Sequence, residues 1–141
     1  MTAPTAQSLY SREILRLAMS LPHDDRIDRI DGSATRRSPV CGSEMSVDVA
    51  LTDGSISAVA VRARACALGQ ASAAVLRAEA IGRTLVELAE TRAQIEDALT
   101  AKGEMPPAWA ALAYARDYPA RHGAILLPFD TLIAAMAEAG A

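Results

Sequence analysis

The chain has 141 residues, a formal net charge of −3 at pH 7, 51% hydrophobic residues and 4% aromatic residues. A chain of this length can bury a core without disulfides or a structural metal, so we expect a single domain. The acidic balance argues against nucleic-acid binding, and no apolar run reaches the roughly 20 residues that cross a membrane. With two cysteines and no leader-like start, the sequence predicts a cytoplasmic protein whose thiols are reduced.

The first third of the chain predicts one helix followed by a loop. Residues 1–7 are small and polar, and we expect them to be disordered. From residue 8 an apolar stripe with helical spacing predicts a helix that ends at Pro22. The charged run 23–32 then predicts a solvated loop.

The middle of the chain has the alternation of a β-hairpin. Apolar and polar residues alternate over 45–51, which predicts a half-buried strand. Asp53-Gly54 is typical of a tight hairpin turn, and a second strand is predicted over 55–65. Ile56 is out of phase with the apolar residues that follow it, which indicates a bulge. A weaker pattern over 34–37 predicts a third strand.

The remainder of the chain is predicted to be helical. An alanine-rich helix is expected over 67–81, with Gly82 as its C-terminal cap. A capping box at 84–87 begins the next helix, and prolines separate two further helices over 108–116 and 120–138. This order predicts an α+β fold, in which helices pack on one face of a small antiparallel three-stranded sheet.

The two cysteines are the candidate chemical groups. Cys66 comes directly before the alanine-rich helix, where the helix N-terminus and the neighbouring Arg62 and Arg64 would favour the thiolate. Cys41 lies in a loop; if that loop covers the end of strand 55–65, the two sulfurs converge on one site. The alternative is that a lone cysteine among alanines is a small buried hydrophobe, and two widely separated cysteines are not a metal motif.

Five segments in order resemble a known family, the IscU/SufU/NifU N-terminal scaffold proteins of iron–sulfur cluster assembly. They are the opening helix over 9–17, Cys41-Gly42 before an alternating strand, RACALGQASA at 64–73, GRTLVE at 82–87 and YPAR at 118–121. The resemblance covers nearly the whole length. It therefore implies one NifU N-terminal-like (IscU-like) domain over 1–141, with a SufE/NifU-like fold.

The resemblance also implies a function. Cys41 and Cys66 would hold a transient cluster of the 2Fe–2S type, or zinc, on a protein that is not an enzyme. A cysteine desulfurase would supply the sulfur, and recipient apo-proteins or cluster carriers would take the product. A homodimer through the alanine-rich helical surface is compatible with the sequence, although no residue specifies it.

Two departures from the family pattern affect the predicted ligands. The aspartate that usually follows Cys-Gly is Ser43, and the third cysteine aligns with Ala124. Glu44 and His122 are candidate replacements if the loop shifts, and imidazole, thiolates and a carboxylate suit zinc. For His122 the alternative is a solvent-facing residue at the start of a helix.

Three functions therefore remain open from the sequence. The first is a cluster assembly scaffold with a reduced ligand set. The second is an adaptor paralogue that keeps the fold and a partner surface but binds no metal. The third is a SufU-like, zinc-dependent sulfur-transfer protein, in which a thiolate accepts sulfur from the desulfurase.

Overall fold

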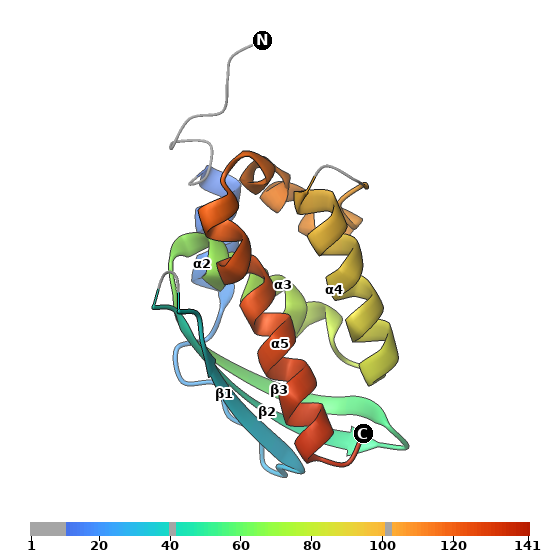
Figure 1. The fold of residues 1–141 in the computed structure, drawn as a ribbon. Helices are drawn as coiled ribbons and strands as arrows, with labels where there is room; N and C mark the ends of the chain where they lie inside the picture. Colours follow the sequence, from blue (N-terminus) through green and yellow to red (C-terminus); the bar gives the residue numbers. More distant parts are fainter. Residues whose placement is uncertain (1–10, 40–41, 101–102) are drawn as a thin grey trace.

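The computed structural model of the chain describes residues 11–39, 42–100 and 103–141 (Figure 1). Its elements in chain order are α2 (Arg12–Ser20), β1 (Gly32–Arg37), β2 (Glu44–Thr52), β3 (Ser55–Arg64), α3 (Ala67–Glu79), α4 (Leu85–Leu99), the 3₁₀ helices η1 (Pro107–Asp117) and η2 (Pro119–Arg121), and α5 (His122–Glu138).

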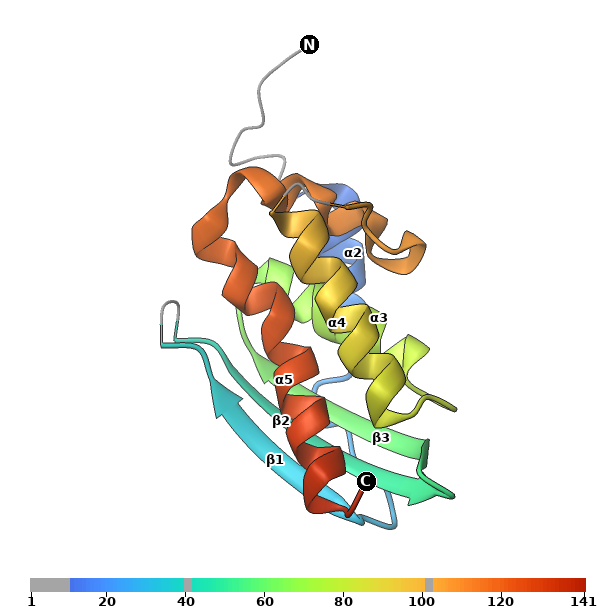
Figure 2. The same ribbon diagram turned by 45° about the vertical axis from the view of Figure 1, so that its right-hand side comes forward.

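The predicted α+β class is confirmed. The three strands form one antiparallel sheet in the order β1-β2-β3. Helix α5 lies across β1 and β2, α3 packs on β3, and α4 packs on α5, so the helices cover one face of the sheet (Figures 1 and 2). In the described part of the chain, no helix is long and apolar enough to cross a membrane.

The hairpin has the predicted turn and the predicted bulge. Asp53 and Gly54 have φ values of 52° and 80°, the left-handed conformation that a tight hairpin turn needs. The register between β2 and β3 shifts after Ala50, which leaves Ser57 as the additional residue on β3. The weak pattern over 34–37 is a real strand, which begins two residues earlier than predicted, at Gly32.

Helix ends follow local capping chemistry. The capping box predicted at the start of α4 is present, with the Thr84 hydroxyl accepting from Glu87 N–H and the Glu87 carboxylate accepting from Thr84 N–H. Helix α3 ends at Glu79, earlier than predicted. Gly82, at φ 86°, lies in the following turn, and its N–H donates to the carbonyl of Ile56 on β3 (2.8 Å).

The short helix predicted over 108–116 is present as the 3₁₀ helix η1. Its buried residues are Trp109, Leu112 and Ala115, which are spaced three apart. That spacing matches the three residues per turn of a 3₁₀ helix, so the tighter winding brings all three to one buried stripe.

The loop over 23–32, which the sequence predicted to be solvated, is partly buried. Asp25 is only 8% exposed, because the segment that carries it packs along β3. Strand β3 is an edge strand of the sheet, and the Asp25 carboxylate accepts the N–H of Val61 on that edge (3.0 Å). The prediction was wrong at this residue. The Asp25 carboxylate lies in a charged run typical of a solvated loop, but it accepts a hydrogen bond from an N–H that would otherwise be unpaired at the edge of the sheet.

Candidate functional site

Cys66 lies at the strand–helix junction that the sequence predicted. It is the N-cap residue of α3, with φ −64° and ψ 169°, and its side chain makes no capping hydrogen bond. The thiol is half-buried against the core, and the Cys66 carbonyl accepts from Gln70 N–H (3.0 Å) in the first turn of the helix. The first-turn N–H groups of α3 therefore begin beside this residue.

Arg62, one of the two arginines before Cys66, bonds to other groups than the thiol. Strand β3 ends at Arg64, two residues before Cys66, so the alternation of side chains along β3 does not set the direction of the thiol. Arg62 donates from Nη1 to the carboxylate of Asp48 (2.8 Å) and to the carbonyl of Asp25 (2.9 Å). Its charge is therefore balanced within the sheet rather than by the thiol.

The loop between β1 and β2 is described on both sides of Cys41, which itself lies outside the described residues. Ser38 N–H donates to the Ser43 carbonyl (2.8 Å), and Gly42 N–H donates to the Ser38 carbonyl (2.9 Å). Ser38 and Ser43 are both buried, and Gly42 has a φ of 71°. These bonds close the base of the loop, while convergence of the two sulfurs stays a prediction.

The first turn of α5 adjoins both other segments. Ala124, the residue that aligns with the family's third cysteine, is 1% exposed. A Cβ placed on Gly69 of α3 would lie 3.4 Å from the Ala124 carbonyl oxygen, and one placed on Gly123 would lie 3.6 Å from the Ser38 hydroxyl. The start of α3, the base of the loop and the start of α5 therefore meet.

His122 begins α5 and is half-buried. Its Nε2 lies 2.7 Å from the carbonyl oxygen of Ala115. Because a carbonyl only accepts, Nε2 carries a hydrogen, and in the neutral imidazole Nδ1 then has a lone pair. A hydrogen bond of this kind often orients a histidine that binds metal through its other nitrogen. Among the described residues, however, no group of three or more histidine, cysteine or acidic side chains could hold a metal ion.

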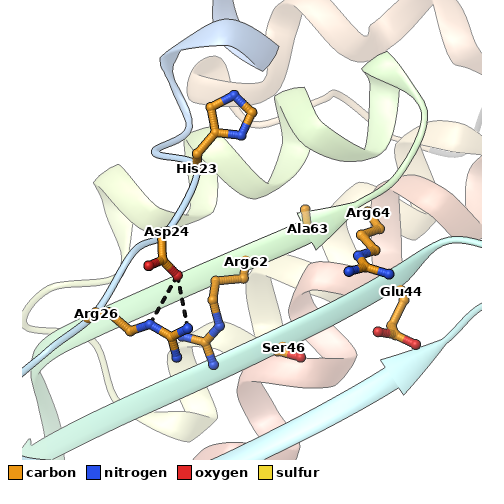
Figure 3. A pocket seen from close by; sticks show the side chains of 8 residues that line it. All are labelled: His23, Asp24, Arg26, Glu44, Ser46, Arg62, Ala63 and Arg64. Atoms are coloured by element: carbon orange, nitrogen blue, oxygen red, sulfur yellow. Dashed lines mark hydrogen bonds and ion pairs between the residues drawn. The ribbon is translucent and has the colours of Figure 1, made fainter.

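Glu44 is on the other face of the sheet. It precedes the fully buried Met45 on β2, so its side chain points away from the helices. Its carboxylate pairs with Arg37 (2.6 Å), and the hydrogen bond and charge of that arginine lower the pKa of the Glu44 carboxyl. Glu44, Ser46 and Arg64 line a hollow of about 380 Å³ on this outer face. Figure 3 shows these side chains.

The chain is similar in fold and in sequence to proteins of known structure. No family model and no curated protein matches the sequence. A NifU-like protein (N-terminal) from Brucella abortus is 31% identical, with a TM-score of 0.87 over 95% of this chain and 96% of that one. At this identity over nearly the full length of both, the chain belongs to the NifU-like N-terminal family. The predicted resemblance is confirmed.

Two more distant structures share the fold. One is a putative iron–sulfur cluster assembly scaffold protein for the SUF system from Fervidobacterium islandicum AW-1, 24% identical, with a TM-score of 0.80 over 94% of this chain and 99% of that one. The other is described as a hypothetical protein and is 20% identical, with a TM-score of 0.73 over 92% of this chain and 97% of that one.

Proposed function

We propose that this protein is a scaffold for iron–sulfur cluster assembly, which holds a nascent cluster as its cargo through Cys41 and Cys66. The observation that carries the proposal is the meeting of three segments: the N-terminus of α3 at Cys66, the base of the loop that contains Cys41, and the first turn of α5. Membership in the NifU-like family supports the same role.

The ligand set of one chain is smaller than a cluster or a zinc ion normally has. Four protein ligands are usual, and this chain offers two thiols at the proposed site, with Ala124 in place of a third. The Nδ1 nitrogen of His122 is the candidate for a third donor. A second subunit or a small thiol would supply the rest, and a loosely held cargo suits a protein that passes it on.

The proposed partners follow from this role. A cysteine desulfurase delivers the sulfur, and apo-proteins or cluster carriers receive the cluster. A metal-free adaptor is the alternative, because Ser43 and Ala124 occupy the positions where the family usually has an aspartate and a third cysteine. A zinc-dependent sulfur-transfer protein needs the same two thiols but a tighter metal site.

Elemental analysis separates the three functions. Protein purified anaerobically without chelator is compared before and after reconstitution with iron and sulfide, beside the double variant Cys41→Ser/Cys66→Ser. Iron with matching sulfide that the double variant does not retain supports the scaffold. Stoichiometric zinc in the purified protein favours sulfur transfer. No metal in either sample contradicts the proposal and leaves the adaptor.

The candidate third ligand, His122, can be tested separately. His122→Gln keeps an amide N–H donor at the ε position for the Ala115 carbonyl but removes the Nδ1 lone pair. If His122 is a ligand, this variant retains less iron than the unmodified protein while its fold, measured by circular dichroism, is unchanged. Equal iron in the two proteins would exclude His122 from the ligand set.

A further inference from the structure

The two edges of the sheet are covered differently. At the edge of β3, Val61 N–H donates to the Asp25 carboxylate (3.0 Å), which Arg77 of α3 also holds (2.5 Å). Further along the same strand, Ile56 N–H donates to the carbonyl of Arg83 (3.0 Å). That edge is therefore occupied by other parts of the same chain. No described strand pairs with the outer edge of β1, at the opposite border of the sheet (Figure 2).

Alternate residues of β1 present their backbone groups to this open edge. Ser33 N–H bonds outside the ladder, to the exposed carboxylate of Glu138 at the end of α5. Because backbone groups alternate between the two sides of an antiparallel strand, Thr35 and Arg37 face outward as well. The Thr35 carbonyl accepts from Nη1 of the exposed Arg36 (3.2 Å). Two charged side chains therefore cover part of the edge.

We infer that this edge binds the same edge of a second copy of the chain, in antiparallel pairing, with Thr35 on the two-fold axis. Ser33 of each copy then lies opposite Arg37 of the other, so every outward-facing backbone group of β1 meets a partner. A rotation about an axis perpendicular to the sheet does not exchange its faces. The helices of both copies therefore lie on the same side of one continuous sheet.

The charges at the edge are complementary between two copies. Among the described residues, neither Arg36 nor Glu138 forms an ion pair. Arg36 is opposite the buried Met45 of β2, so its side chain is on the same face of the sheet as α5 and Glu138. In the inferred dimer, Arg36 lies next to Ser33 of the other copy, where Glu138 is bonded. Each copy thereby gains an ion pair from its Arg36 to Glu138 of the other.

The same charges select the register. With Thr35 on the axis, Arg36 is opposite Ala34 of the other copy, and no arginine is opposite an arginine. A shift of two residues would put Arg36 opposite Arg36 of the other copy. Like charges directly opposite each other are destabilising, so the register centred on Thr35 is favoured over the shifted one.

The pairing competes with bonds that the single chain already makes. Ser33 N–H has to leave Glu138 for the Arg37 carbonyl of the other copy, and Arg36 has to leave the Thr35 carbonyl. Strand β1 has only six residues, and a small interface is typical of weak association. We therefore expect a monomer–dimer equilibrium that depends on protein concentration.

The inferred dimer is separate from the proposed metal site. Antiparallel pairing puts the two loops that contain Cys41 at opposite ends of the joined strands. The base of each loop, at Ser38, is three residues from Thr35, so the two bases are about 20 Å apart. Neither site gains a ligand from the other copy, and the inference does not depend on the proposed function. The alanine-rich helix α3 is largely buried within its own chain, which leaves the β1 edge as the more accessible surface.

Reversal of the two charges tests the inferred dimer. Association of the parent is measured by sedimentation velocity up to millimolar concentration, and the fold of each variant is checked by circular dichroism. Arg36→Glu and Glu138→Arg each place like charges together at both contacts of the dimer. Each should therefore weaken association about tenfold or more. Arg12→Glu makes the same change on an exposed residue of α2, away from β1, and should associate like the parent.

A mixture of the two charge variants gives a sharper result. In a heterodimer of Arg36→Glu with Glu138→Arg, one contact joins the two reversed charges and the other keeps the native pair. The mixture should therefore associate about as strongly as the parent, although neither variant does so alone. In the parent, hydrogen exchange of the Thr35 and Arg37 amides should slow as the concentration rises, because these groups enter the new ladder.

Other outcomes overturn the inference. A parent that stays monomeric over the whole concentration range does so, and it leaves the edge to a strand of another protein. A dimer that Arg36→Glu leaves intact, or a mixture that stays monomeric, also does so, because either result places the interface elsewhere. If a charge variant does not fold, the parent decides: a dimer with unchanged exchange of the edge amides overturns the inference. None of these measurements needs a metal, so they are independent of iron binding by the proposed scaffold.

Discussion

The close approach of β1 to the last turns of α5 gives the sharpest test of the fold. Gly32 begins β1, and a Cβ placed on it would lie 2.2 Å from the carbonyl oxygen of Ala135 and 2.7 Å from the backbone nitrogen of Ala139. Both atoms belong to the backbone, so no side chain can rotate away to make room. The variant Gly32→Ala therefore forces the strand and the helix apart.

The size of the effect follows from that contact. An ordinary contact begins near 3.4 Å, so α5 has to move from β1 by about 1 Å. Overpacking of this kind costs about 1–3 kcal/mol, and more when backbone must shift. Replacing glycine by alanine recovers about 0.4–1 kcal/mol through the unfolded chain. We expect Gly32→Ala to lower the free energy of unfolding by about 2 kcal/mol.

Urea unfolding followed by circular dichroism measures this, with Gly103→Ala as the control. The nearest atom to a Cβ on Gly103 is the Cβ of Asp97 at 3.8 Å, an ordinary contact. That variant should be as stable as the parent, or more stable by up to about 1 kcal/mol. If Gly32→Ala unfolds at the same urea concentration as the parent, α5 does not approach β1 as closely as described.

Three further changes test the capping box, the buried ion pairs and the position of the missing cysteine. Thr84→Ala should reduce the free energy of unfolding, measured by urea unfolding, by about 1 kcal/mol. The control is Thr91→Ala, which loses only a hydroxyl bond to a helical carbonyl and should change that free energy by less than about 0.5 kcal/mol. Burial raises the pKa of the Asp25 and Asp48 carboxyls, but their hydrogen bonds outweigh it and lower the pKa of both. These bonds come from their arginine partners and from Val61 N–H or the Ser33 hydroxyl, and the charges of the arginines add to the effect. The ionised carboxylates therefore stabilise the fold above their unfolded pKa of about 3.9, and this stabilisation is lost as pH falls through the lower folded-state pKa. Stability measured by urea at a series of pH values should fall steadily below about pH 5, and less steeply in Asp48→Asn; an equal slope would contradict the role of that pair. Ala124→Cys should tighten zinc binding about tenfold or more, equivalent to about 1.4 kcal/mol, in a chelator competition, and no gain would mean that this position does not face the thiols.

Features set by neighbouring residues could be predicted from the sequence. The alternation of β2, the Asp53-Gly54 turn and the Thr84 capping box each depend on residues within a few positions of one another. Cys66 was located at its junction for the same reason, since a strand pattern and a helix pattern meet there. These local signals were enough to give the α+β class.

Features set by distant residues could not be predicted. The partners of Asp25 lie 36 and 52 residues further along the chain, so nothing near Asp25 distinguishes it from the solvated carboxylates beside it. The bond from His122 to Ala115 depends on the 3₁₀ winding of η1, which a single-sequence pattern does not separate from an α-helix.

For Glu44 the signal was available. The alternation that buries Met45 also puts Glu44 on the opposite face of β2, away from the helices. Strand parity therefore predicts that this carboxylate points away from α3 and α5, and its ion pair with Arg37 follows from the cross-strand register.

The single tryptophan gives the protein a built-in optical reporter. Trp109 of η1 is 4% exposed and packs against Phe129 of α5, with ring centroids 5.3 Å apart. Its indole Nε1 has no hydrogen-bond partner among the described residues, so the ring is in an apolar environment. Its fluorescence emission should therefore lie at short wavelength and shift to the red when η1 separates from α5. Because η1 leads through η2 into the first turn of α5, unlabelled protein can report whether loading of the proposed site disturbs that helix.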